Sequence, residues 1–143
     1  MARLFVVALA ARLPRWAQEA RDEYLRRMPR GFEVRCIDLK SGPLARVRAR
    51  LPDRTRLVAL DERGRDLTTA QFAARLQAWR AEGDAVAFII GGPDGLDAEF
   101  RRAADWVLKL SSFTLPHAFA QVLLCEQLYR AASIQSGHPY HRE

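Results

Sequence analysis

Residues 85–95 read AVAFIIGGPDG, and this stretch indicates the fold class. Its first six residues form an uninterrupted apolar run, which is typical of a strand buried on both faces of a parallel sheet. The glycines that follow turn the chain, and a helix is expected from about Asp97 to Val107, with the Asp97 side chain capping its first amides. The stretch thus predicts strand, turn and helix in succession, which is the repeating unit of α/β domains.

The same alternation runs through the rest of the chain. Apolar runs predict further strands at Leu4–Leu9, 32–39 and 56–60, and LSSFTLP at 110–116 forms a short extended segment. Three helices between the strands are indicated by apolar residues at helical spacing: Trp16, Ala20, Tyr24; Leu44, Val47, Leu51; and Phe72, Leu76, Trp79.

Turn and cap residues divide the chain in the same way. Thr69 is a candidate N-cap for the third helix, and Gly83 is its expected stop. A last helix is predicted over about 117–136 and ends at Gly137. Its predicted apolar face runs through Phe119, Val122, Leu123 and Tyr129.

These elements predict a single domain over residues 1–143, an α/β fold with three layers and a mainly parallel sheet. Ligands of such sheets bind beyond the carboxyl ends of the strands. The loops after Leu60, after Ile90 and at 110–115 are therefore expected to lie together and to hold the functional site.

The bulk properties narrow the class of protein. A composition that is 49% hydrophobic and 28% charged fits a folded domain, and the net charge of +6 fits a nucleic-acid partner or, with equal weight, an arginine-rich solvated surface. The apolar run at 4–11 is too short to span a membrane and lacks the layout of a signal peptide. Cys36 and Cys125 lack metal-ligand spacing, so we expect no metal site, no disulfide framework and a cytoplasmic protein.

Three segments could support chemistry, and each also has a structural interpretation. GGPDG at 91–95 could cradle a phosphate, but it lacks a lysine and both common phosphate-loop patterns, so a structural turn is favoured. The backbone of LSSFTLPH at 110–117 could read the edge of an adenine, or the segment could be an edge strand, which is slightly favoured. HPYHRE at 138–143 could hold a phosphate, stack on a base and exchange a proton, although a frayed terminus is the commoner outcome.

Taken together and in this order, IIGGPDG, LSSFTLPH and LYRAASIQSGHPYHRE resemble the C-terminal half of the ribosomal RNA large subunit methyltransferase H family, which belongs to the SPOUT (alpha/beta-knot) methyltransferases. The resemblance is dense over 85–143 and looser before it, where LPRWAQEARDEYLRRMP matches the first helix of the family. HPYHRE is its most specific part.

The resemblance implies a C-terminal trefoil knot and S-adenosyl-L-methionine as cofactor. The implied cofactor-binding positions are Leu60, Gly91, Leu110, Ser111, Ser112, Phe113, Thr114 and Leu115. It also implies a homodimer in which the C-terminal tail completes an active site at the interface. Leu124 and Leu128 on the last helix are candidate interface residues.

The implied reaction is methylation of N3 of a pseudouridine in large-subunit (23S) ribosomal RNA on the assembled ribosome. His141 is the candidate base or proton relay, because a histidine titrates near pH 6.5. Arg142 would hold a phosphate or stabilise charge on the uracil oxygens, and Tyr140 would pack against or hydrogen-bond the base. Alignment of the nucleophile with the methyl group could also suffice without a dedicated base.

Two other functions stay open. The chain could be a SPOUT methyltransferase of transfer RNA or of another ribosomal position, or a ribosome-binding factor without enzymatic activity. The stretch 40–56 is shorter than the lysine-rich insertion expected in many relatives, so any RNA contact there would fall to Arg46, Arg48, Arg50 and Arg54.

Overall fold

A computed structural model describes residues 3–10 and 12–142. Met1, the end of the first apolar run at Ala11 and the end of the predicted tail at Glu143 lie outside the described residues. Over the described part, five strands alternate with five helices: β1 (Leu4–Leu9), α1 (Arg15–Arg26), β2 (Val34–Leu39), α2 (Leu44–Ala49), β3 (Arg56–Asp66), α3 (Thr69–Ala81), β4 (Val86–Gly91), α4 (Ala98–Ala103), β5 (Trp106–Lys109) and α5 (His117–Ser136).

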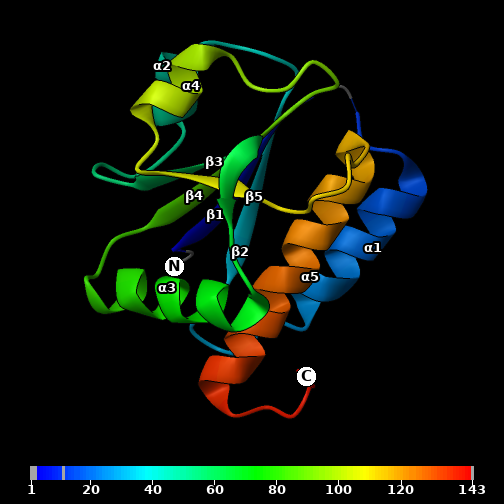
Figure 1. The fold of residues 1–143 in the computed structure, drawn as a ribbon, viewed down its shortest axis with the longest axis vertical. Coiled ribbons are helices and arrows are strands. Elements are labelled where there is room, and N and C mark those ends of the chain that lie inside the picture. Colours follow the sequence, from blue (N-terminus) through cyan, green and yellow to red (C-terminus); the bar gives the residue numbers. More distant parts are fainter. Residues whose placement is uncertain (1–2, 11, 143) are drawn as a thin grey trace.

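The strands form one parallel sheet in the order β2-β1-β4-β3-β5 (Figure 1). β1 and β4 are its centre, and their ladder runs from the pair Leu4 and Val86 to the pair Leu9 and Gly91. Both central strands are buried on both faces, as their uninterrupted apolar runs predicted.

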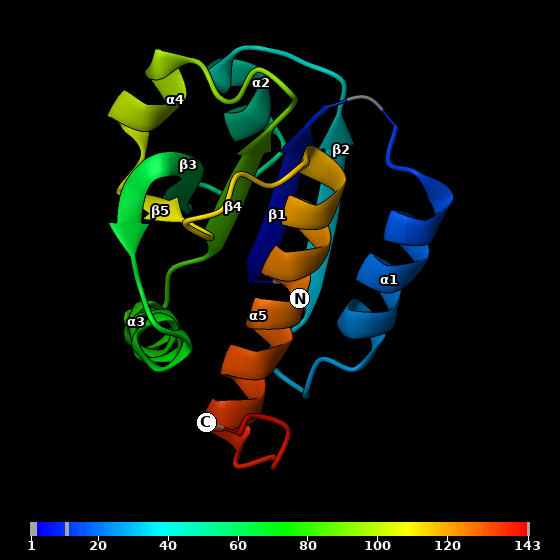
Figure 2. The same ribbon diagram turned by 45° about the vertical axis from the view of Figure 1, so that its right-hand side comes forward.

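Helices cover the two faces of the sheet, which confirms the predicted three layers (Figures 1 and 2). On one face, Phe72, Leu76 and Trp79 of α3 pack with Leu124 and Leu128 of α5 over one side of the strands. The opposite face is covered by α2 and α4, whose buried residues include Leu44, Val47 and Phe100. The knot implied by the resemblance stays a prediction.

The region after the 91–95 turn differs from the sequence-based expectation. The predicted helix 97–107 ends at Ala103, and its last residues form the edge strand β5 beside β3. A short apolar run does not distinguish strand from helix, and here pairing with β3 decides for the strand. Asp97 precedes α4, but its side chain makes no capping hydrogen bond, and 110–116 is a loop rather than an extended segment.

The predicted apolar face of α5 was only partly right, because Tyr129 is buried but two other members of that face are not. Phe119 is 51% exposed and Leu123 is 38% exposed, whereas Leu124 and Leu128 are fully buried and cannot be surface contacts. The reason is that α5 is apolar on both sides, so its sequence does not reveal which side faces the sheet. Gly137 ends α5 with a positive φ of 78°, as predicted.

The start of α3 is displaced by one residue from its predicted position. Thr68, not Thr69, is the N-cap, and it forms a capping box with Gln71. Gly83 follows the helix with a φ of 81°, as expected of a stop. Among the described residues, no helix is both long and apolar enough to cross a membrane.

Both cysteine thiols are shielded from solvent, Cys125 fully and Cys36 in part. Burial raises the pKa of the Cys36 thiol to about 11 and also raises that of Cys125. Thiols that stay protonated near neutral pH are poor nucleophiles and poor metal ligands. In the part of the chain that is described, no three His, Cys, Asp or Glu side chains are grouped as a metal site.

The buried and the exposed leucines of α5 can be distinguished by how much their truncation lowers the free energy of unfolding. Leu128→Ala should lower the free energy of unfolding by about 2–5 kcal/mol, because it leaves a cavity between α5 and the sheet. Leu123→Ala is the matched control on the exposed side and should cost less than about 1 kcal/mol. Urea unfolding at one fixed protein concentration measures both, and equal losses would contradict the assigned orientation of α5.

Candidate functional site

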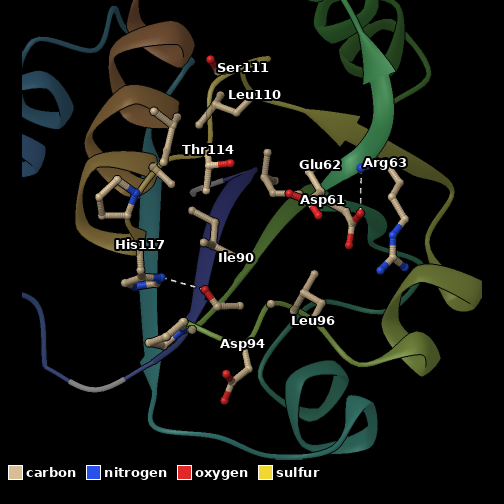
Figure 3. Close-up of a pocket in the computed structure, with 18 of the residues that line it drawn as sticks. Asp61, Glu62, Arg63, Ile90, Asp94, Leu96, Leu110, Ser111, Thr114 and His117 are labelled. Carbon is tan, nitrogen blue, oxygen red and sulfur yellow. Dashed lines mark hydrogen bonds between the residues drawn. The ribbon is translucent and has the colours of Figure 1, made fainter.

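Three loops that are far apart in sequence meet at the carboxyl edge of the sheet and enclose a cavity of about 680 Å³ (Figure 3). They are residues 60–63 of β3, residues 90–96 after β4, and the segment from 110 to the start of α5. These are the loops that the strand pattern predicted to lie together. A cavity of this size suits a small organic molecule.

The loop after β4 is folded tightly on itself. A Cβ atom on Gly91 would lie 2.5 Å from the carbonyl carbon of Gly95, which is too close for any side chain. The amide of Gly95 donates to the Gly92 carbonyl at 2.9 Å and closes the turn. Gly91 is therefore required by close backbone packing, and it leaves the wall of the cavity without a side chain.

The β3 wall contains a bulge. Leu60 and Arg65 both pair with Leu108 of β5, so the four residues between them leave the ladder. In this bulge, the Asp61 carboxylate accepts a hydrogen bond from the Arg63 amide at 2.8 Å and lies 3.5 Å from the Arg101 guanidinium of α4. The bulge places a carboxylate that is only 10% exposed at the cavity wall.

The third wall is joined to the second by a hydrogen bond. His117 Nδ1 lies 2.7 Å from the carbonyl oxygen of Gly91, which is the dashed line at His117 in Figure 3. Before it, the Ser111 hydroxyl accepts from the Phe113 amide at 3.0 Å and bends the loop. The loop therefore keeps a defined shape without regular secondary structure.

Most positions that the resemblance implied for the cofactor line this cavity. Ser112 belongs to the same loop but is not a lining residue. The implied positions that do line it are Leu60, Gly91, Leu110, Ser111, Phe113, Thr114 and Leu115.

Sequence reasoning did not identify several polar groups of the cavity. Asp61 and Glu62 directly follow the predicted strand end at Leu60, so their place after a parallel strand was a usable signal. His117 was considered only as the last residue of the 110–117 segment, without a role of its own. Arg101 comes from a helix whose packing the sequence did not reveal.

The tail residues lie on α5 rather than in the cavity of their own chain. The Tyr140 hydroxyl donates to Glu126 Oε2 at 2.8 Å, and Arg130 donates to the same oxygen at 2.7 Å. Arg130 also approaches His141 Nδ1 at 3.2 Å, and because a guanidinium can only donate, this nitrogen accepts. Arg142 is exposed. The tail up to His141 is thus fastened to the helix.

Protonation within this tail cluster follows from its hydrogen bonds. Burial alone would raise the pKa of Glu126, but the bonds from Arg130 and Tyr140 outweigh burial and lower it. Burial and the bond to Glu126 raise the pKa of Tyr140 to about 12. Tyr140 is therefore a neutral hydrogen-bond donor at physiological pH and not a base.

The tail and the cavity occupy opposite sides of α5. Glu126 comes nine residues after His117, which places it about 14 Å along the helix axis and about 180° around it. Tyr140 and His141 are fastened at this second side, so within one chain they do not approach the cavity. The exposed Phe119 and Leu123 lie on the same outer side as Glu126.

The four arginines of the 40–56 segment are all exposed: Arg46, Arg48, Arg50 and Arg54. They lie on and just after α2, on the face of the sheet opposite α5. Their position leaves them available to a polyanion.

The steric requirement at Gly91 can be tested directly. Gly91→Ala should lower the free energy of unfolding by about 1–3 kcal/mol, because the 91–96 turn must open to admit the methyl group. Gly92→Ala is the milder comparison, since its Cβ would meet the Leu9 carbonyl oxygen at 3.2 Å, a tight contact but a smaller overlap. Hydrogen exchange of amides 92–96 should accelerate more in the first variant than in the second, and unchanged exchange in Gly91→Ala would contradict the predicted clash.

Comparison with known proteins identifies the family of this chain. A family described as "Predicted SPOUT methyltransferase" matches residues 2–141. A relative named ribosomal RNA large subunit methyltransferase H, from Delftia acidovorans (strain DSM 14801 / SPH-1), is 49% identical over 154 aligned positions, which cover 99% of each chain. The alignment is longer than the 143 residues here, so this chain lacks residues that the relative has.

Solved structures share the fold at low sequence identity. A probable methylase family protein from Haemophilus influenzae Rd KW20 gives a TM-score of 0.66 at 13% identity, over 99% of this chain and 71% of that one. The SpoU methyltransferase AviRb from Streptomyces viridochromogenes, in complex with AdoMet, gives 0.52 at 16%, over 89% and 56%. With the full-length relatives, these findings establish that the chain belongs to the ribosomal RNA large subunit methyltransferase H family of SPOUT methyltransferases.

Proposed function

We propose that this protein transfers the methyl group of S-adenosyl-L-methionine to N3 of a pseudouridine in 23S ribosomal RNA, acting on the assembled ribosome in the cytoplasm. The observation that carries the proposal is the cavity, because it is built from the same three segments that the family resemblance assigns to the cofactor. The printed name of the 49% identical relative supports a ribosomal RNA substrate.

The residues of the cavity fit this cofactor. S-adenosyl-L-methionine combines an adenosine with a sulfonium and an amino acid group, so it needs backbone partners for a base and anions for its cationic groups. The loop from Leu110 to Leu115 offers backbone amides and carbonyls beside a wall without a side chain at Gly91. Asp61 and Glu62 supply carboxylates to the same cavity. The bound AdoMet of AviRb, which shares the fold, agrees with this fit.

The tail supplies groups for the nucleobase. When bound, the sulfonium provides an electrophilic methyl group, and N3 of pseudouridine must lose a proton to attack it. His141 would accept or relay this proton, which requires that its Nδ1 leave Arg130 or that its Nε2 act. Tyr140 would hydrogen-bond or pack against the base as a neutral phenol, and the exposed Arg142 would hold a phosphate.

The separation of tail and cavity favours a homodimer in which each tail serves the cavity of the partner. One chain cannot bring His141 to its own cavity, since Glu126 and His117 face opposite sides of α5. The outer side of α5 presents exposed apolar area at Phe119, Leu123 and Ile134. The exposed Trp16 packs against Phe119 with the two ring centroids 4.8 Å apart. An apolar stripe that continues into the tail cluster suits a twofold interface.

A methyltransferase that acts on another RNA is the second candidate. The net charge of +6 and the exposed arginines after Lys40 attract any polyanion, so they do not distinguish one RNA substrate from another. The HPYHRE tail favours the ribosomal substrate. A ribosome-binding factor without activity would need no cofactor cavity, so the presence of the cavity is evidence against this alternative.

Label transfer tests the reaction. Tritiated S-adenosyl-L-methionine should label a single 23S pseudouridine in ribosomes from a strain that lacks the endogenous enzyme, as mapped by mass spectrometry. His141→Ala should keep cofactor affinity and lower turnover by about a hundredfold, because general base catalysis contributes about that much. Label on transfer RNA instead would move the substrate, and full turnover in His141→Ala would remove the base role.

Mixed dimers test whether the tail acts in the partner. Gly91→Ala damages the cavity and His141→Ala damages the tail, so each homodimer should be strongly impaired. Refolded together in equal amounts, half of the dimers carry both variants and keep one intact composite site, which gives about a quarter of the wild-type activity. Gel filtration should show the dimer, and activity no higher than in the separate variants would overturn the exchange of tails.

A further inference from the structure

A line of polar side chains crosses one helical layer from the edge strand to the cavity. Asp38 of β2 accepts from the Arg21 guanidinium of α1 at 3.1 Å. Arg21 Nη1 also donates to Gln121 Oε1 of α5 at 2.9 Å, and Gln121 Nε2 lies 2.8 Å from His117 Nε2. The line ends where His117 Nδ1 meets the Gly91 carbonyl.

The two inner members of this line are buried in an otherwise apolar layer. Arg21 is 5% exposed and Gln121 is 1% exposed. Burial alone would lower the pKa of Arg21, but the bond and the charge of Asp38 raise it, so the guanidinium stays charged. Buried polar groups without a partner cost free energy, and among the described residues Arg21 Nε is buried without a hydrogen bond, so the line carries a cost that a fully apolar layer would avoid.

Both ends of the line fix the direction of every hydrogen bond in it. A guanidinium can only donate, so the oxygen of the Gln121 amide must face Arg21 and its NH2 group must face His117. His117 Nε2 therefore accepts. The ring proton is then on Nδ1, where it is donated to the carbonyl of Gly91, which can only accept.

A proton on His117 Nε2 would be incompatible with these hydrogen-bond directions. It would face the NH2 group of Gln121, and rotation of that amide would only move the conflict to Arg21. The charged groups near this point are Arg21 and, beyond it, Asp38 and Asp22. His117 is thus poorly placed to act as a base, although it lines the cavity.

We propose that Arg21, Gln121 and His117 form a line of hydrogen bonds with a single donor-to-acceptor direction. This line holds the Gly91 carbonyl in place and so sets the shape of the cofactor cavity. His117 is a positioning residue in this arrangement, kept as the neutral Nδ1–H tautomer. Its bond joins the 90–96 wall to the start of α5, which are two of the three walls of the cavity. The inference rests on the proposed function for the identity of the cofactor, whereas the hydrogen-bond line itself does not.

The tautomer is read directly from two-bond proton–nitrogen correlation spectra of the wild-type protein. The chain has three histidines, and the signal that disappears in His117→Asn belongs to His117. We expect the Nδ1–H pattern at neutral pH. The Nε2–H pattern or a protonated ring would overturn the line, whether or not the variants fold.

Cofactor affinity tests the effect on the cavity. The amide nitrogen of asparagine can occupy the place of Nδ1 and donate to Gly91, whereas that of glutamine reaches only the place of Nε2. Calorimetry with S-adenosyl-L-methionine should therefore give about tenfold weaker binding for His117→Ala and His117→Gln, which lose the hydrogen bond to the Gly91 carbonyl, and binding within about threefold of wild type for His117→Asn, which keeps it. Equal affinities for His117→Asn and His117→Gln would overturn the positioning role.

Gln121→Glu tests the direction of the line. Its carboxylate still accepts from Arg21 but offers His117 only an acceptor, so a proton should appear on His117 Nε2. Gln77→Glu makes the same change on an exposed part of α3 and should leave the His117 signal unchanged. An unaltered His117 signal in Gln121→Glu would overturn the inference. A wild-type protein that does not bind S-adenosyl-L-methionine would instead refute the proposed function and the cofactor part of this inference, while the tautomer would still decide the line.

Discussion

The absence of room beside Gly91 is the constraint on which the functional part of the structure depends. β4 is a central strand, and at its last residue the chain folds back so closely that a methyl group would meet the backbone of Gly95 at 2.5 Å. The turn that results exposes backbone to the cavity and presents the Gly91 carbonyl to His117. The bulge of β3 and the loop before α5 then close the cavity around this turn.

Helix α5 serves two environments at once. Its inner side packs Leu124 and Leu128 against the sheet and carries Gln121 and His117 toward the cavity, while its outer side presents Phe119 and fastens the tail through Glu126. Because these sides are half a turn apart, cavity and tail are separated within a chain, and this separation is the basis of the proposed exchange of tails.

The alternation of apolar runs with helical spacing was sufficient to predict the layered α/β fold, the parallel sheet and the edge at which loops 60–63, 90–96 and 110–116 meet. These features follow from local sequence, because a strand buried on both faces must be apolar throughout and a parallel neighbour must be reached through a helix. The same local rules were not sufficient for β5, whose four residues become a strand only because β3 lies beside them. They were also not sufficient for the face of α5, since a helix that is apolar on two sides can be buried on either.

The residues of the site can be divided in the same way, into those that local sequence reveals and those that only the fold brings together. The sequence by itself determined that Gly91 ends a buried strand, that a polar loop follows β5 and that the chain ends in imidazole, phenol and guanidinium groups. Only the tertiary structure decided that Asp61 and Arg101 meet in the cavity wall, that Arg21 reaches His117 through Gln121, and that Tyr140 is fastened to Glu126. The physical reason is that strand and helix formation depend on neighbours in sequence, whereas hydrogen bonds between Arg21 and Gln121, 100 residues apart, depend on which faces the packed core leaves together.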